Sequence, residues 1–280
     1  MIESYRDKSI DRRRFLYLGG AAAGLTLVGC SDDSSSGAKE AVPTAPAPST
    51  SAAVGQCVLT SNVTEGPYYL DNALVRQDIT EGKAGVPLRI RLTVQNAGGS
   101  CAPVPGAAVE IWHCDAWGYY SGFTTANPGG NAPAEAADGS RANDTTYLRG
   151  YQIAGEDGVV EFVTIFPGWY TPRVAHVHVK VHTGGANTDG IYEGGKVNHT
   201  GQLFFDDATA ATVYALAPYN RHTGTPTLLA ADMVYGKGGA KDGLTTLTPL
   251  RAGAPADGYL AALTLGIDPT KEAAAGGAPG

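Results

Sequence analysis

The sequence predicts an all-β fold, a β-sandwich of short, mostly antiparallel strands with long functional loops. Residues 88–94 alternate apolar and polar side chains with a period of two, which is typical of a half-buried strand. Glycine- and proline-containing turns separate further short apolar runs, at 107–112, 147–153, 159–165, 175–182, 201–205 and 259–265. No segment shows a long helical period. Only 17% of the residues are charged, which excludes a long coiled coil.

Two stretches rich in glycine and asparagine interrupt these runs. Residues 122–146 and residues 183–200 are therefore predicted as long surface loops, the places where a rigid sandwich often carries its function. We expect the sandwich domain to span residues 56–270 and residues 271–280 to be a disordered tail.

Residues 1–30 are predicted to be an export signal. Arg12 and Arg13 precede an uncharged stretch, 15–29, that is too short to span a bilayer. The twin arginine resembles a Tat signal, with an ordinary Sec signal as the alternative. Leu27-Val-Gly-Cys30 resembles a bacterial lipobox, which predicts lipidation of Cys30. The alternative is cleavage at a later small residue without lipid. The expectation is a protein held at the bacterial cell envelope, on its periplasmic or extracellular face, by a lipid anchor alone.

The residues that follow predict a linker and a disulfide. Residues 31–55 are mostly Ser, Asp, Pro, Thr and Ala without any aromatic residue, so they are expected to be a disordered tether. Three cysteines remain beyond it, and an exported protein can oxidise them. Cys114 lies in an expected buried strand end and is predicted to be free. Cys57 and Cys101 are predicted to pair.

The charge balance excludes one class of partner. Residues 56–280 carry 14 basic and 21 acidic residues, so the domain lacks the basic surface with which proteins bind nucleic acid.

Residues 175–182 read Ala-His-Val-His-Val-Lys-Val-His and form the most informative strand. A period of two places His176 and His178 on one face and the valines on the other. Two imidazoles so placed can chelate one metal ion, although strand histidines more often bind nothing. His182 lies on the same face at the strand end, and we expect it to face solvent.

Two aromatic segments accompany this strand. Tyr170 follows Pro167-Gly168 in a turn, and Arg173 stands three residues before His176. Taken alone, Tyr170 is explained as a packed tyrosine and Arg173 as a surface charge. The other segment is 112–122, where a predicted strand runs into an aromatic turn.

Together these pieces resemble the intradiol ring-cleavage dioxygenases, the non-haem Fe(III) enzymes that open catechol rings. The family pattern is Trp-x-x-Asp-x-x-Gly-x-Tyr-Ser, then a tyrosine after Pro-Gly, then Arg-x-x-His-x-His, and the chain has all three in this order. Residues 64–69, Thr-Glu-Gly-Pro-Tyr-Tyr, resemble the family's segment at the substrate pocket. Residues 200–205 resemble its later strand, whose glutamine lies near the iron. The resemblance covers residues 57–265.

The resemblance implies one Fe(III) per chain, for which phenolate oxygens are suitable hard ligands. The implied ligands are Tyr120, Tyr170, His176 and His178. Neighbouring residues of a strand point to opposite sides, so only one of Tyr119 and Tyr120 can face the histidines, and the family spacing selects Tyr120.

The resemblance also implies the reaction. A small aromatic diol would be cleaved by O2 between its two hydroxyl-bearing carbons, giving a cis,cis-muconate-type product. Tyr170 would act as a base as well as a ligand. Arg173 would stabilise negative charge on the ring, and Gln202 would support Arg173 or the metal-bound water. The residues implied at the substrate pocket are Gly66, Pro67 and Tyr68.

One departure leaves two questions open. Catechol 1,2-dioxygenases carry a helical dimerisation region before the sandwich, and nothing before the sandwich here has a helical period. The oligomeric state and the particular catechol therefore stay open. Two other functions compete with the resemblance: an exported metalloprotein of the copper/zinc superoxide dismutase type, and a non-catalytic surface binding module.

Overall fold

The computed structural model describes residues 57–71, 74–123 and 146–273. The predicted signal peptide with Cys30, the linker, most of the predicted 122–146 loop and the end of the predicted tail lie outside these residues.

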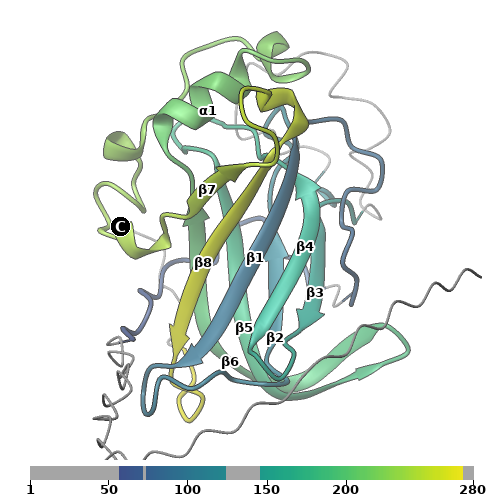
Figure 1. Cartoon of the computed structure of the whole chain (residues 1–280), viewed down its shortest axis with the longest axis vertical. Helices are drawn as coiled ribbons and strands as arrows, with labels where there is room; N and C mark the ends of the chain where they lie inside the picture. The colour runs from purple at the N-terminus through teal and green to yellow at the C-terminus, as the bar shows by residue number, and fades with distance from the viewer. Residues whose placement is uncertain (1–56, 72–73, 124–145, 274–280) are drawn as a thin grey trace, which may run out of the picture. The chain divides into compact units, whose positions relative to one another are not determined.

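The described residues form two four-stranded sheets, with the strand orders β4-β1-β8-β7 and β3-β2-β5-β6 (Figure 1). Figure 1 shows the first sheet in front of the second. The strands are β1 (Pro87–Asn96), β2 (Ala108–Trp112), β3 (Arg149–Ile153), β4 (Val159–Ile165), β5 (His176–Thr188), β6 (Ile191–Phe204), β7 (Thr246–Pro249) and β8 (Tyr259–Ile267).

Strand pairing confirms the predicted fold class and adds one parallel pair. Each neighbouring pair runs antiparallel except β1 and β8, which run parallel from Leu88 opposite Tyr259 to Asn96 opposite Ile267. The sandwich is therefore mostly antiparallel, as its short turn-separated strands predicted.

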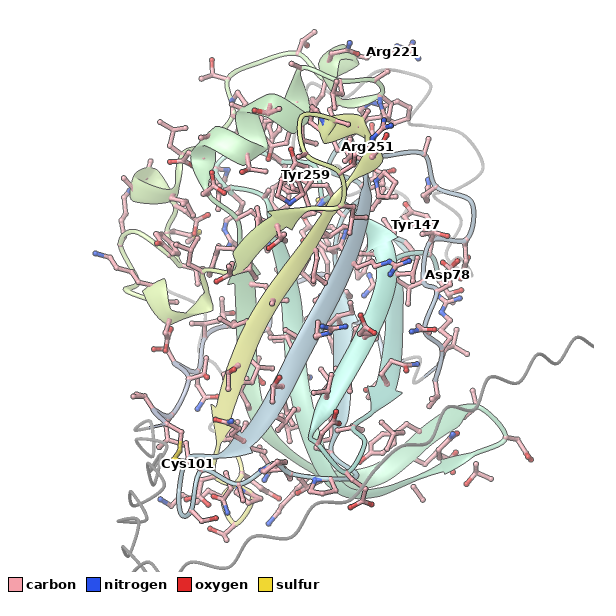
Figure 2. The ribbon with its side chains drawn as sticks, in the orientation of Figure 1. Asp78, Cys101, Tyr147, Arg221, Arg251 and Tyr259 are labelled. Carbon is pink, nitrogen blue, oxygen red and sulfur yellow. A yellow bond between two sulfur atoms is a disulfide. The ribbon has the colours of Figure 1, made fainter. Side chains whose placement is uncertain are left out.

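The core lies between the two sheets. The aliphatic face of β1 is buried, including Ile90 and Leu92, while Arg89 and Arg91 on its other face are exposed. From β5 of the second sheet, Val177 and Val179 enter the same core cluster. Figure 2 shows the side chains that the strands carry. Burial of these aliphatic faces is the main stabilising contribution that the sequence encodes.

The second sheet is buried on its other face as well, because a chain segment crosses it. The amide of Val63 donates to the carbonyl of Thr200 in β6, and the ring of Tyr69 lies edge-on to that of Trp112 in β2, so residues 63–69 pass over this face. The expectation that His182 faces solvent is wrong: its ring packs against those of Tyr151 and Tyr192 and is only 8% exposed. Its Nε2 lies 3.3 Å from a carboxylate oxygen of Glu110. Strand alternation gave its face correctly, but it could not indicate that this face is covered.

The prediction that residues 183–200 form a loop is wrong. β5 and β6 continue through it as a two-stranded hairpin, which extends beyond the sandwich in Figure 1 and turns at Asp189 and Gly190. Most of the side chains near this turn are exposed on both faces. The hairpin therefore has no apolar alternation by which a sequence could reveal it.

One α-helix and four short 3-10 helices lie between the later strands. α1 (Asp207–Tyr214) is capped at its N-terminus by Asp206, whose side chain accepts a hydrogen bond from the Thr209 amide. With only eight residues, α1 shows too little periodicity to be predicted. The 3-10 helices are η3 (Tyr219–Arg221), η4 (Leu229–Ala231), η5 (Lys241–Gly243) and η6 (Pro255–Asp257). Among the described residues, no helix has the length and apolar character needed to cross a bilayer.

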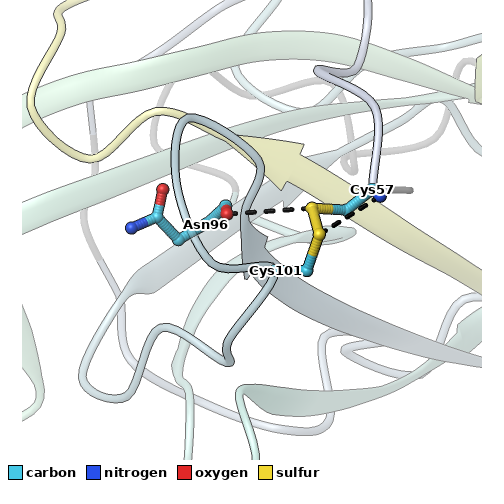
Figure 3. Close-up of a disulfide and its surroundings, with 3 residues drawn as sticks. All are labelled: Cys57, Asn96 and Cys101. Carbon is cyan, nitrogen blue, oxygen red and sulfur yellow. Dashed lines mark hydrogen bonds between the residues drawn. A yellow bond between two sulfur atoms is a disulfide. The ribbon is translucent and has the colours of Figure 1, made fainter. Parts of the chain in front are cut away.

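A disulfide joins Cys57 to Cys101, the pairing that the sequence predicted (Figure 3). Cys101 lies at one end of the sandwich, and Tyr147, just before β3, lies toward the other end (Figure 2). Cys114 is free and buried. Its thiol donates to the carbonyl of Gly168.

Candidate active site

The register of the second sheet sets four side chains in a row across it. Arg149 of β3 is opposite Trp112 of β2, Trp112 is opposite His178 of β5, and His178 is opposite Gln202 of β6. The indole of Trp112 stacks on the His178 ring, with 4.7 Å between the ring centroids. His176 lies two residues before His178 on the same face, as the period of two predicted.

Tyr120 is positioned by a loop that Asp115 organises. The buried carboxylate of Asp115 accepts the backbone amides of Trp117 and Tyr119, at 2.9 and 3.0 Å. Gly118 has a φ of +87°, and a Cβ there would come within 2.9 Å of the Trp169 carbonyl oxygen. The tight turn that presents Tyr120 to the histidines therefore requires glycine.

Tyr170 reaches the same place from the turn that joins β4 to β5. The amide of Gly168 donates to the Asp115 carbonyl, so this turn packs directly against the Tyr120 loop. Tyr170 and Arg173 pair through their backbones, just before β5 begins.

Four side-chain atoms converge at this point. The Tyr120 hydroxyl oxygen lies 3.3 Å from His176 Nε2, 3.2 Å from His178 Nε2 and 3.4 Å from the Tyr170 hydroxyl oxygen. His176 Nε2 lies 3.2 Å from His178 Nε2 and 3.4 Å from the Tyr170 hydroxyl. All four side chains are almost fully buried. The structure thus brings together the four side chains that the resemblance implied as ligands.

The protonation of the histidines fits a metal ion. His176 Nδ1 lies 2.6 Å from the Val174 carbonyl, which can only accept, so Nδ1 carries the proton and Nε2 presents a lone pair to the cluster. Burial lowers the pKa of His176 and of His178, which keeps both imidazoles neutral. Within the described part of the chain, His178 Nδ1 has no hydrogen-bond partner.

The tyrosines fit a metal ion for a complementary reason. Burial raises the pKa of both the Tyr120 and the Tyr170 hydroxyl in spite of the nearby Arg173, so neither is expected to ionise without a metal cation at its oxygen. A bound cation would supply that charge. Two phenolates with two neutral imidazoles form a donor set suited to ferric iron.

Arg173 and Gln202 adjoin this cluster and contact one another. The Arg173 Nη2 group donates to Gln202 Oε1, and the Gln202 amide group donates to the Thr64 carbonyl at 3.2 Å. The Arg173 Nε group donates to Asp232 at 2.8 Å. Sequence reasoning missed Asp232, because it lies 59 residues beyond Arg173 in a segment without a motif.

The segment expected at the substrate pocket covers the cluster. The ring of Tyr68 stacks on that of Tyr120, with centroids 4.6 Å apart. Gly66 has a φ of +79°, and a Cβ there would lie 3.2 Å from His178 Cε1. Pro67 lies between them and is exposed. Lys180 and Glu65 form an ion pair that ties this segment to β5.

Arg149 is a second buried cation at the site, which sequence reasoning did not single out. Its guanidinium donates to Ser121 Oγ at 2.8 Å and to the backbone carbonyls of Tyr68 and Ser121, at 2.8 and 2.9 Å. Arg149 therefore holds the pocket segment against the Tyr120 loop.

The remaining histidines do not join the cluster. His113 bonds to Thr164 and to the Cys114 carbonyl, and His222 stacks on Trp169. The described residues contain no group of three or more His, Cys, Asp and Glu side chains placed to hold a metal. A site of the copper/zinc superoxide dismutase type, which needs about six histidines, is therefore not favoured.

Comparison with known proteins places the chain in a family. A family model described as "Dioxygenase" matches residues 64–216, more than half of the chain. A solved intradiol ring-cleavage dioxygenase from Tetranychus urticae is 30% identical, with a TM-score of 0.64, over 78% of this chain and 98% of its own. The chain belongs to the intradiol ring-cleavage dioxygenase family.

The curated relatives are matched over a smaller part of their own length. Catechol 1,2-dioxygenase 1 of Acinetobacter lwoffii is 31% identical over 201 residues, which are 62% of this chain and 58% of that protein. A chlorocatechol 1,2-dioxygenase of Pseudomonas sp. (strain P51) is 35% identical over 141 residues, or 47% of this chain and 55% of that protein. The chain thus spans little more than half the length of these relatives.

Proposed function

We propose that this protein is an Fe(III)-dependent dioxygenase that cleaves a catechol-type diol with O2 between its two hydroxyl-bearing carbons, giving a cis,cis-muconate-type product. The observation that carries the proposal is the convergence of Tyr120, Tyr170, His176 and His178 in a chain of this family. Catechols are the substrates named for two of its relatives.

The four convergent residues would hold one iron per chain. Ferric iron, when bound, supplies the chemistry that side chains lack, by drawing electron density from the diol so that its ring can react with O2. The protein provides a dry site for this chemistry. Tyr68 and Trp112 cover the Tyr120 and His178 rings and exclude water from them.

Tyr170 and Arg173 have separate roles in the proposed reaction. The Tyr170 oxygen takes a proton from the diol, and burial raises the pKa of this hydroxyl, so the proton is held once transferred. Arg173 places a fixed positive charge beside the ring, where it stabilises negative charge that develops in the transition state. Gln202 accepts a hydrogen bond from Arg173 and so keeps the guanidinium directed toward the site.

The test combines metal analysis with turnover. Purified protein should contain about one iron per chain, with a high-spin ferric EPR signal and the red-brown colour of tyrosinate-to-iron charge transfer. Oxygen uptake with catechol, protocatechuate, hydroxyquinol and chlorocatechols would identify the substrate. Blue-green protein holding copper would contradict the proposal. So would colourless protein without turnover after maturation with iron.

We propose also that the chain is exported by the Tat pathway and anchored through lipid on Cys30. The supports are Arg12-Arg13, the Leu27–Cys30 motif and the Cys57–Cys101 disulfide, since structural disulfides belong to oxidising compartments. Replacing both arginines by lysine should block export, and Cys30→Ala should release the protein from membranes. A Cys30→Ala protein that still fractionates with membranes would contradict the anchor.

A further inference from the structure

Asp232 is a fully buried carboxylate that contacts the active site through the Arg173 side chain and through the Val174 amide. Its Oδ2 accepts the Arg173 Nε–H at 2.8 Å and the Val174 amide at 3.0 Å. Its Oδ1 accepts the amides of Val234 and Tyr235, at 2.8 and 2.9 Å. Each carboxylate oxygen thus accepts two hydrogen bonds. Both donors to Oδ2, Arg173 and Val174, lie just before β5.

The Arg173 guanidinium is consequently held at two separate points. Asp232 binds the Nε group, and Gln202 binds the Nη2 group. Two anchors on one planar group set both its position and the direction of its plane, whereas a single anchor would let the side chain rotate. Gln202 is itself fixed, because its amide nitrogen donates to the Thr64 carbonyl.

The charges of this pair support the same arrangement. Burial acts to raise the pKa of Asp232, but Arg173 and the backbone amides outweigh it and hold that pKa below its usual value. The side chain of Asp232 is 0% exposed and that of Arg173 is 9% exposed. A charge this deeply buried is held only with its partner in place.

We propose that Asp232 is a positioning residue for the dioxygenase reaction: it holds the Arg173 guanidinium at the angle from which its charge acts on the reacting ring. This inference rests on the proposed function. Asp232 has no direct hydrogen bond to any of the four ligands. Its bond to the Val174 amide leads to His176, whose Nδ1 bonds to the Val174 carbonyl, so an effect by that route would lower iron content, whereas an effect through Arg173 leaves iron content unchanged.

Substitution by asparagine separates the two oxygens of Asp232. Asn can keep an oxygen on the Val234 and Tyr235 amides, but its NH2 group then faces the Arg173 Nε–H and the Val174 N–H, which are both donors. The turn at 232–235 is retained and the anchor of Arg173 is lost. We expect Asp232→Asn to lower kcat by on the order of 10- to 100-fold, with KM changing less.

A double-mutant cycle tests the route of this effect. Arg173→Ala should lower kcat by on the order of 10²-fold. If Asp232 acts through Arg173, adding Asp232→Asn to Arg173→Ala should change kcat less than about twofold. Unfolding by denaturant gives a readout that does not depend on activity. The double variant should lose less free energy of unfolding than the sum of the two single losses, because no unpaired buried charge remains.

Two further variants complete the experiment. Asp232→Glu keeps the charge and is expected to fold, but it moves the carboxylate by one methylene, so kcat should fall in this variant too. Asp257→Asn breaks the exposed Arg251–Asp257 ion pair and should leave kcat unchanged.

Three results would contradict a positioning role for Asp232. Folded Asp232→Asn with kcat within twofold of wild type would overturn the proposal. So would Asp232→Glu with wild-type kcat, or an Asp232→Asn effect that is equally large in the Arg173→Ala background. Failure of the proposed function gives a different outcome, because the wild-type protein itself would then show no turnover.

Discussion

The two sheets of the sandwich use the faces of their strands differently. In the β4-β1-β8-β7 sheet, β1 buries aliphatic side chains on one face and exposes arginines on the other. In the β3-β2-β5-β6 sheet, β2 is buried throughout and β5 is buried over its first seven residues. The first sheet has one buried face, and the second has two.

The second buried face contains polar groups rather than aliphatic ones. His176, His178 and Gln202 lie on it, under the segment that includes Gly66 and Tyr68. Buried polar groups need partners, and here other side chains supply them, with the proposed iron as a further partner for the four convergent residues. A sandwich can therefore form a dry active site on the outside of a sheet when a chain segment covers that sheet.

The largest expected effect comes from removing a ligand. His178→Ala should abolish iron binding and turnover, because one of four donors is lost from a buried cluster. The fold should persist, since the valines on the opposite face of β5 remain in the core. Metal analysis with circular dichroism checks both statements. Val179→Ala, on that opposite face, is the matched control and should keep its iron.

A substitution in the aliphatic face of the first sheet should have the opposite effect: it should lower stability and leave the iron site intact. Leu92→Ala should lower the free energy of unfolding by about 2–5 kcal/mol, because it opens a cavity in the core. Iron content and kcat of the folded protein should stay at wild-type values. Denaturant titration alongside kinetics measures the two separately. Loss of iron from folded Leu92→Ala would show that the two faces are not independent.

Low pH should reduce the free energy of unfolding through His113, which links the two sheets by bonding to Thr164. Burial lowers the pKa of His113 to about 4, while in the unfolded chain it is about 6.5. The unfolded chain therefore takes up this proton first. The stabilisation is complete above pH 6.5 and falls by roughly 3 kcal/mol as the pH drops to about 4. The free energy of unfolding at pH 7 and pH 4.5 should differ less in His113→Gln than in wild type.

A substitution on the exposed face of the first sheet should have the smallest effect on the free energy of unfolding. Arg91 and Glu161 form an ion pair of 3.2 Å between β1 and β4, and about half of the Arg91 side chain is exposed. Arg91→Ser should change the free energy of unfolding by less than about 1 kcal/mol. Denaturant titrations at low and high salt would measure this effect. A larger, salt-independent loss would show that this face also depends on buried contacts.

The features that could be predicted from the sequence are those that a period of two or a short motif encodes. The alternation at 88–94 predicted β1, and the His-Val-His alternation placed both histidines on one face. The family motifs led to Tyr120, Tyr170 and Arg173. Asp232 and Arg149 could not be found in this way, because their roles depend on contacts with residues distant in sequence. The hairpin at 183–196 was missed because exposed strands need no apolar pattern.

The disulfide determines where a pulling force would enter the domain. Cys57 precedes Gly66 and Tyr68 in the chain and is bonded to Cys101, just after β1. Tension on the preceding residues would pass at Cys57 into a covalent link with the end of β1. The backbone beyond Cys57, which leads to Gly66 and Tyr68, would share that load instead of carrying all of it. A force applied at Cys57 would therefore reach the pocket cover only in part, because the end of β1 takes up the rest.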